Sequence, residues 1–158
     1  MANTQAMCTS FLGEILTATH NFGTAPVRAV TTPDVFKAAL YLTTATLNAS
    51  TTVYSSTGEV SGTNYTAGGV TVTNATAPAS TNSSTTAGVG YWTSSASLVY
   101  TNVTLTTAFD TVFIYNSTQS NKAVSVHTFG SQTITAGTFT LTMPSNTTST
   151  ALLRLATT

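Results

Sequence analysis

Apolar side chains recur at two different periods along the chain, and the period changes after Pro33. From Gln5 to Thr17 they are spaced three and four residues apart, which predicts an amphipathic helix. From Phe36 to Leu42 apolar residues stand at every second position, which predicts a strand with one buried face. The residues expected on that face are Phe36, Ala38, Leu40 and Leu42.

The remainder of the chain predicts a series of short strands. Gly68 and Gly69 supply the positive φ angles of a turn before one of them. Ala136 and Gly137 predict the tight turn of a hairpin, in which Phe139, Leu141 and Met143 face the core. The predicted strands are Thr51–Ser55, Val70–Thr73, Ser97–Leu105, Phe109–Tyr115, Lys122–Phe129, Gln132–Thr135, Thr138–Met143 and Ala151–Ala156.

Eight or nine short strands with frequent turn signals predict an all-β fold. We expect a β-sandwich or a small barrel of jelly-roll or Ig-like type, with a short N-terminal helix. The chain is divided into a helical segment at residues 1–30 and a β-domain at residues 31–158. Residues 75–90 are polar and of low complexity, and we interpret them as a long loop of the β-domain.

The composition supports strands and excludes several functions. The 158 residues include 39 Thr, and threonine is β-branched and favours pleated strands. Only 5% are charged, against about 25% in ordinary domains. Four basic residues cannot form the positive surface that nucleic-acid binding or peripheral membrane binding needs. We therefore expect no nucleic-acid partner and no membrane partner. The N-terminus shows no secretory signal pattern, and no apolar run is long enough to span a membrane.

Few side chains have reactive groups, and each has a structural interpretation. His127 alternates with its neighbours in a strand, which favours a partly buried structural histidine. His20 follows a predicted helix and can interact with the helix end, and Cys8 lies on the apolar stripe as a core residue. No spacing matches a metal site or a phosphate-binding loop. We expect no enzymatic activity, no catalytic residues, no metal and no cofactor. The four acids are Glu14, Asp34, Glu59 and Asp110.

Two stretches carry a resemblance to a known group of proteins. The first is Tyr54-Ser-Ser-Thr-Gly-Glu-Val-Ser-Gly-Thr-Asn-Tyr-Thr-Ala-Gly-Gly69, and the second is His127-Thr-Phe-Gly-Ser-Gln-Thr-Ile-Thr-Ala-Gly-Thr-Phe-Thr-Leu-Thr-Met-Pro144. With the N-terminus and Phe109-Asp110, they resemble small structural proteins from the virions of tailed bacteriophages, over most of the chain except residues 75–90. Asn64 stands where such a turn would carry glycine, and asparagine also tolerates a positive φ.

The resemblance implies a capsid cement or decoration protein on the outside of the virion, made in the host bacterial cytoplasm. Its partner would be the major capsid protein. The formal net charge of zero is typical of a protein packed against other subunits, so we expect a homo-oligomer such as a trimer. The expected contacts are Phe11 to Ile15 and the loop at 75–90. A head–tail adaptor, a tail or fibre component, and a carbohydrate-binding module using Tyr91 and Trp92 remain alternatives.

Overall fold

The computed structural model describes residues 3–16, 19–22, 33–74, 76–81 and 88–156. Within them the fold is all-β with one short helix, which confirms the predicted fold class. The helix is α1 (Thr9–Leu16), and the strands are β1 (Ala6–Met7), β2 (Phe36–Leu42), β3 (Val70–Val72), β4 (Ala79–Ser80), β5 (Val89–Trp92), β6 (Leu98–Asn116), β7 (Lys122–Leu141) and β8 (Leu153–Ala156).

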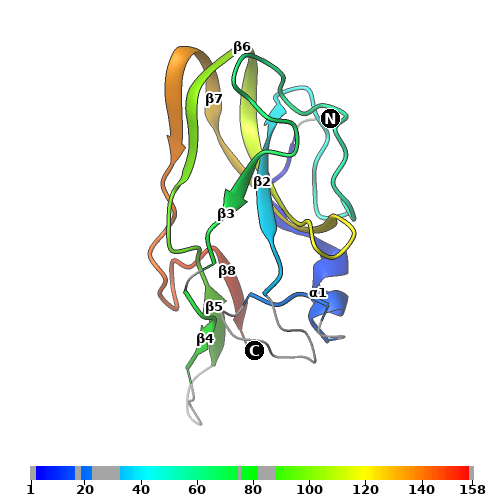
Figure 1. Cartoon of the computed structure of the whole chain (residues 1–158). Helices are drawn as coiled ribbons and strands as arrows, with labels where there is room; N and C mark the ends of the chain where they lie inside the picture. The colour runs from blue at the N-terminus through cyan, green and yellow to red at the C-terminus, as the bar shows by residue number, and fades with distance from the viewer. Residues whose placement is uncertain (1–2, 17–18, 23–32, 75, 82–87, 157–158) are drawn as a thin grey trace.

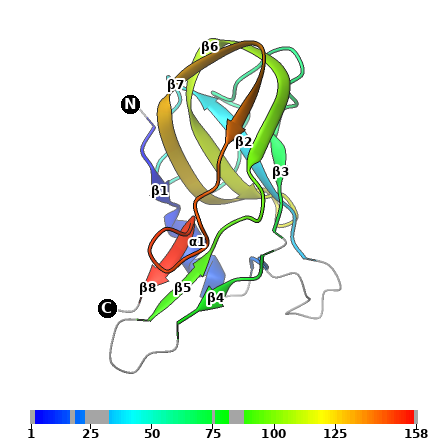
Figure 2. The same ribbon diagram turned by 90° about the vertical axis from the view of Figure 1, so that its left-hand side faces the viewer.

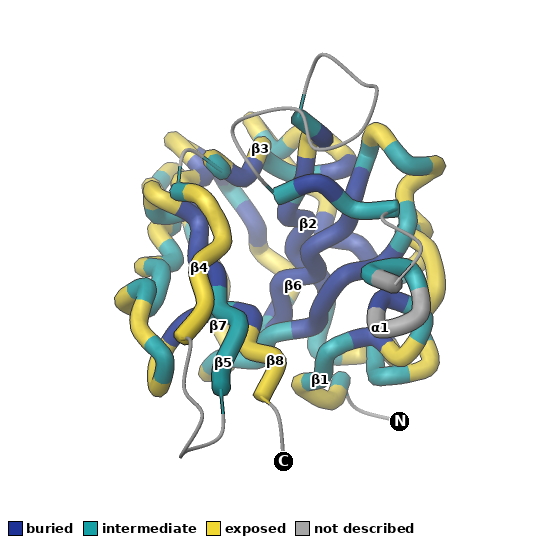
Figure 3. The backbone as a smooth tube through the Cα atoms, turned by 90° about the horizontal axis from the view of Figure 1, so that it is seen from below, coloured by how far each residue is buried: buried dark blue, intermediate teal, exposed yellow. Residues whose placement is uncertain are grey.

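The strands form two antiparallel sheets. The larger sheet has the order β1-β7-β6-β2-β3, and a small sheet has the order β4-β5-β8 (Figure 1). The small sheet lies with α1 at the opposite end of the molecule from the top of β6 and β7. Seen from below, the backbone of β4 and the end of β8 are exposed, whereas most of the backbone of β2 is buried (Figure 3). The described part of the chain has no helix that is long and apolar enough to cross a membrane.

β6 and β7 are longer than the sequence predicts. The segments predicted at Ser97–Leu105 and Phe109–Tyr115 merge into one continuous strand that begins at Leu98. The three segments predicted between Lys122 and Met143 merge into another that ends at Leu141. The hairpin predicted at Ala136 and Gly137 is wrong, because Gly137 pairs with Val103 of β6. Ala136 does have a positive φ of 46°, but β7 accommodates it through an irregularity in its pairing with β6. The residues that predict a turn, Ala136 and Gly137, therefore lie at a β-bulge within a continuous strand.

The pair β6–β7 arches at the top of the molecule (Figure 2). We call the half of this strand pair that is remote from the turn between Asn116 and Lys122 the outer hairpin. It consists of Leu98–Phe109 of β6 and Thr128–Leu141 of β7. Aromatic rings fill the space under the arch, where Phe139 lies edge-on to Phe109 with ring centroids 5.2 Å apart. Phe129 lies 5.5 Å from Phe139 and completes the cluster. As predicted, Phe139 is partly buried while the threonines beside it are exposed.

The predicted N-terminal helix is too long at its start. Ala6 and Met7 form β1 and pair with Val126 and Ser125 of β7, so the helix begins at Thr9. Backbone pairing with an open sheet edge outweighs helical periodicity at these two residues. The predicted end at Thr17 lies outside the described residues. Cys8 and Phe11 are buried in the same core as β2 and β6.

The prediction of a single buried face for β2 is also wrong, although its bounds are confirmed. Ala39 and Tyr41, expected on the outer face, are both fully buried. The connection between β2 and β3 covers that face, and Tyr41 donates a hydrogen bond to the carbonyl of Ser55 within it. The strand predicted at Thr51–Ser55 is reduced to one bridge, between Val53 and Lys122.

The remaining differences concern the small sheet. The loop predicted at 75–90 contains β4 and the first two residues of β5, while residues 75 and 82–87 lie outside the described residues. The strand predicted at Ala151–Ala156 is confirmed as β8, which pairs with β5. Val70–Thr73 is confirmed as β3, and Gly68 and Gly69 have the expected positive φ.

Candidate functional site

His20 lies in a polar network between α1 and the end of β6. Its Nε2 is 2.7 Å from Oε2 of Glu14, and its Nδ1 is 3.1 Å from the side-chain nitrogen of Asn116. The ammonium of Lys122 lies 2.6 Å from Oε1 of Glu14. Burial lowers the pKa of His20. Burial alone would raise the pKa of Glu14, but hydrogen bonds from Lys122 and His20 hold it below its usual value.

Asp34 continues this network on the other side of Asn116. Its Oδ2 accepts hydrogen bonds of 2.9 Å from the backbone nitrogen of Asn21 and from the side-chain amide of Asn116. Its Oδ1 accepts one of 3.0 Å from Gln119. These bonds join the segment after α1 to the turn between β6 and β7 through two buried polar groups. The sequence identifies Glu14, His20 and Asp34 as titratable residues but does not predict that they lie in one network.

Glu59 lies in a second buried polar group, formed with tyrosines. Tyr54 and Tyr65 donate hydrogen bonds of 2.6 and 2.7 Å to its two oxygens, and the backbone nitrogen of Gly68 donates another of 2.7 Å. Tyr54 stacks on Tyr115, whose hydroxyl donates to the carbonyl of Gly68. Burial, with the carboxylate beside them, raises the pKa of Tyr54 and Tyr65. Four of these residues, Tyr54, Glu59, Tyr65 and Gly68, lie in the first stretch of the resemblance, whereas Tyr115 lies in β6.

His127 and Cys8 occupy the structural positions that the sequence predicts. Nε2 of His127 lies 2.9 Å from the hydroxyl of Ser125, and burial lowers the pKa of His127 to about 4. Ser125 is 2% exposed, so its hydroxyl is not open to a substrate. Cys8 is fully buried, and burial raises its pKa to about 11. Among the described residues, no group of three His, Cys, Asp or Glu is placed to hold a metal ion.

The outer hairpin presents a polar surface without charged side chains. No Asp, Glu, Lys or Arg occurs between Glu59 and Asp110, or between Lys122 and Arg154. A contact between this surface and another molecule would therefore rest on hydroxyl, amide and backbone groups rather than on charge. Its exposed polar residues are Thr101, Asn102, Thr106, Thr107, Ser131, Gln132, Thr133, Thr135, Thr138 and Thr140.

The two stretches of the resemblance meet at the outer hairpin. The second stretch forms most of its β7 strand, and the first stretch runs beside its β6 strand. Thr63 forms a bridge with Thr104, and the side-chain amide of Asn64 donates a 2.8 Å hydrogen bond to the carbonyl of Asn102. Asn64 has a φ of 61°, as expected for its turn.

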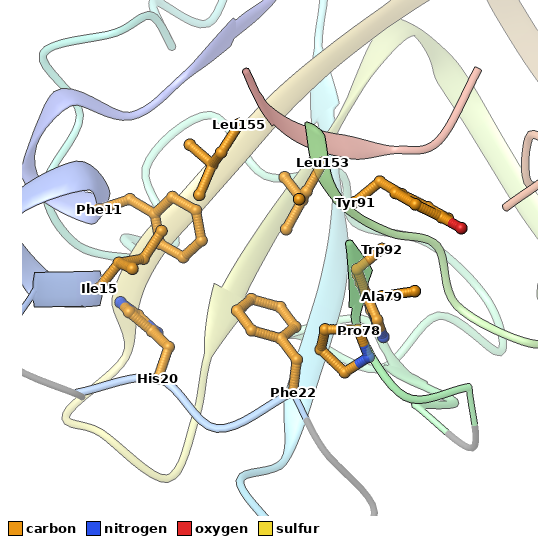
Figure 4. A pocket seen from close by; sticks show the side chains of 11 residues that line it. Phe11, Ile15, His20, Phe22, Pro78, Ala79, Tyr91, Trp92, Leu153 and Leu155 are labelled. Carbon is orange, nitrogen blue, oxygen red and sulfur yellow. The ribbon is translucent and has the colours of Figure 1, made fainter. Parts of the chain in front are cut away.

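An apolar pocket of about 200 Å³ lies between α1 and the small sheet (Figure 4). Trp92 lies in its wall and is only 3% exposed, so its ring cannot serve as a platform on which a sugar stacks. It packs instead against Phe22, with ring centroids 4.8 Å apart. The residues that line the apolar pocket are Phe11, Ile15, His20, Phe22, Pro78, Ala79, Gly90, Tyr91, Trp92, Leu153 and Leu155.

Comparisons of the chain with protein-family models, with curated proteins and with solved structures give no match.

Proposed function

We propose that this chain is a structural protein of a tailed-phage virion, a cement protein that binds the outside of the assembled capsid and bridges neighbouring subunits. The observation that carries the proposal is the outer hairpin, an extended, exposed surface without a single charged side chain. A chain of net charge zero with such a surface is suited to contact with other subunits. The resemblance of its two flanking stretches to virion proteins supports the same function.

The free edge of β7 adds a second reason. In the described part of the chain, β7 pairs with residues outside β6 only near its start, at Lys122 through the bridge to Val53 and at Ser125 and Val126 through β1. From His127 to Leu141 its other edge therefore has no strand partner in the described part of the chain. Such an edge offers backbone donors and acceptors to a second polypeptide, and no lysine or proline within it opposes pairing.

Binding of this kind has a recognisable dependence on conditions. Since the outer hairpin lacks charge, its contacts rest on shape, apolar groups and hydrogen bonds, and added salt should weaken them little. A single contact is expected to be weak. A symmetric oligomer, such as a trimer at a capsid symmetry axis, gains affinity because it binds several neighbouring subunits at once.

The test uses virions and particles that lack the protein. Quantified gel bands of purified virions should show a copy number that scales with the major capsid protein, and particles without the protein should lose integrity sooner on heating or osmotic shock. Adding purified protein back should restore survival equally at low and high salt. Equal survival with and without the protein, together with its presence only in purified tails, would place it with the adaptor and tail proteins instead.

Three matched variants test the surface itself. Thr107→Lys and Thr133→Lys each put a charge on an exposed position of the outer hairpin and should reduce particle binding at least tenfold. Thr57→Lys makes the same change at an exposed position of the connection between β2 and β3, and should bind like the wild type. Equal binding by all three variants would contradict a role for the outer hairpin.

A further inference from the structure

We propose that the apolar pocket is a binding site for one uncharged, apolar group of about the size of an aromatic ring. Its walls come from α1, from the small sheet, and from the segment that contains His20 and Phe22 (Figure 4). Leu153 and Leu155 project into it from β8, opposite Phe11 and Ile15 of the helix.

The polar atoms of the lining side chains are already committed or point elsewhere. Both ring nitrogens of His20 have partners, in Glu14 and Asn116. The indole nitrogen of Trp92 donates a 2.8 Å hydrogen bond to the carbonyl of Thr76. The hydroxyl of Tyr91 points away from the apolar pocket (Figure 4). A bound polar group would therefore lose its hydrogen bonds to water without replacement, which disfavours polar and charged ligands.

The lining side chains offer a water molecule few of the polar partners that an ordered water needs, so an apolar group displaces water from the apolar pocket at little cost. Size then decides the class of ligand. An apolar cavity of about 150 Å³ holds benzene, so about 200 Å³ accommodates one substituted ring. Phe22, which is only partly buried, presents aromatic surface to such a ring, and offset or edge-to-face contacts would favour it over a saturated group of equal size.

Gly90 leaves this space open from the side of the small sheet. A Cβ atom added at Gly90 would meet only the carbonyl oxygen of Leu155, at 3.9 Å. Gly90 pairs with Leu155 and lines the apolar pocket, so a larger side chain there would enter it. Leu155 is 42% exposed. An apolar ligand would cover this exposed surface.

The apolar group that binds in the apolar pocket comes from one of two sources, which share the same chemistry. It is either a free apolar molecule, or an aromatic or aliphatic side chain of a virion subunit that the protein contacts. The second source rests on the proposed function, whereas the binding site itself does not.

The first experiment uses toluene as the probe and benzoate as its charged counterpart. Toluene should raise the Tm of the wild-type protein and shift NMR signals of residues in the apolar pocket, and benzoate should do neither. Gly90→Leu should weaken toluene binding at least tenfold. Gly130→Leu is the matched control, because a Cβ at this exposed strand position meets nothing within 4 Å.

A second variant keeps the test informative if Gly90→Leu fails to fold. Leu155→Asp puts a carboxylate at an already exposed position beside the apolar pocket and should also weaken toluene binding. The proposal is overturned if saturating toluene leaves the Tm and the spectrum of the wild type unchanged. It is equally overturned if the wild type, Gly90→Leu and Gly130→Leu bind toluene with the same affinity.

The second experiment separates the two sources by adding each variant to particles that lack the protein. Loss of particle binding by Gly90→Leu, with normal binding by Thr57→Leu at an exposed position outside the outer hairpin, assigns the site to a side chain of the virion partner. Normal binding by both variants, with the toluene result standing, assigns it to a free apolar molecule. Failure of the wild type to bind particles would count against the proposed function and leave the toluene result as the support for the site.

Discussion

The hydroxyl of Tyr65 donates a 2.7 Å hydrogen bond to Oε1 of Glu59 and accepts one of 3.0 Å from the backbone nitrogen of Leu40. One side chain thus joins a buried carboxylate to strand β2. Through it the connection between β2 and β3, which has almost no strand structure of its own, is held against the sheet. The first predictions concern this connection.

Glu59→Gln should destabilise the fold by about 2 kcal/mol, because the carboxylate accepts three hydrogen bonds and an amide nitrogen cannot accept. At least one buried donor would then face another donor. Urea unfolding at pH 7 measures the loss. Tyr54→Phe, which removes one of the three bonds and retains the ring stack on Tyr115, should cost about 1 kcal/mol. An unchanged midpoint for Glu59→Gln would show that the network does not hold the connection.

Gly69→Ala should be far more damaging, because the backbone leaves no room for a side chain. Gly69 has a φ of +73°, and a Cβ there would meet the carbonyl oxygen of Ala38 in β2 well inside van der Waals contact. We expect a loss well above 1 kcal/mol, or no folded protein. Gly130→Ala is the control, because a Cβ atom at Gly130 has open space. Its free energy of unfolding should stay within about 0.5 kcal/mol of the wild-type value. Equal unfolding midpoints would refute the close approach at Ala38.

The stability of the protein should fall in mild acid because of its buried histidines. Burial lowers the pKa of His127 from 6.5 to about 4, so between these values the unfolded chain binds a proton that the folded protein does not. The contribution of His127 to the free energy of unfolding is therefore fully present above pH 6.5 and is lost as the pH falls toward 4. For His127 the loss between pH 7 and pH 5 is about 2 kcal/mol. Burial of His20 acts in the same direction.

Urea unfolding of the wild type and of His127→Gln at the two pH values measures this contribution. His127→Gln cannot titrate in this range, so its stability should change less between pH 7 and pH 5. The same slope for both proteins would mean that His127 keeps its ordinary pKa in the folded state.

Sequence periodicity predicts the elements whose contacts are local and misses those that long-range pairing decides. The bounds of β2 and the turn at Gly68 and Gly69 follow from short patterns. The length of β7 does not, because the turn signal at Ala136 and Gly137 has two outcomes. It closes a hairpin, or it forms a bulge where another strand already occupies the edge, as β6 does here.

The candidate sites show the same limit. The burial of Cys8 and Trp92 could be expected from their apolar character. The hydrogen bond between His20 and Glu14 of α1 could not be expected, because a contact of His20 with the carbonyl groups at the helix end is equally consistent with the sequence. Three segments that are distant in sequence form the apolar pocket, so no local sequence pattern predicts it.

The arch of β6 and β7 should depend on the aromatic cluster beneath it. Phe139 contacts Phe109 and Phe129, and Tyr100 lies 5.9 Å away. Phe139→Ala would remove the ring on which the outer hairpin rests, and we expect a loss of about 3 kcal/mol in urea unfolding. Thr140→Ala changes the exposed neighbour on the opposite face of the same strand and should stay within about 0.5 kcal/mol.

The same two variants connect the fold to the proposed function. Particle binding at low urea concentration should be lost in Phe139→Ala even where circular dichroism shows that β structure remains, because the outer hairpin would no longer keep its arched shape. Thr140→Ala retains the arch and removes one hydroxyl of the exposed surface, so its binding should weaken by no more than about fivefold. If Phe139→Ala binds particles as tightly as the wild type, the contact surface lies elsewhere than on the outer hairpin.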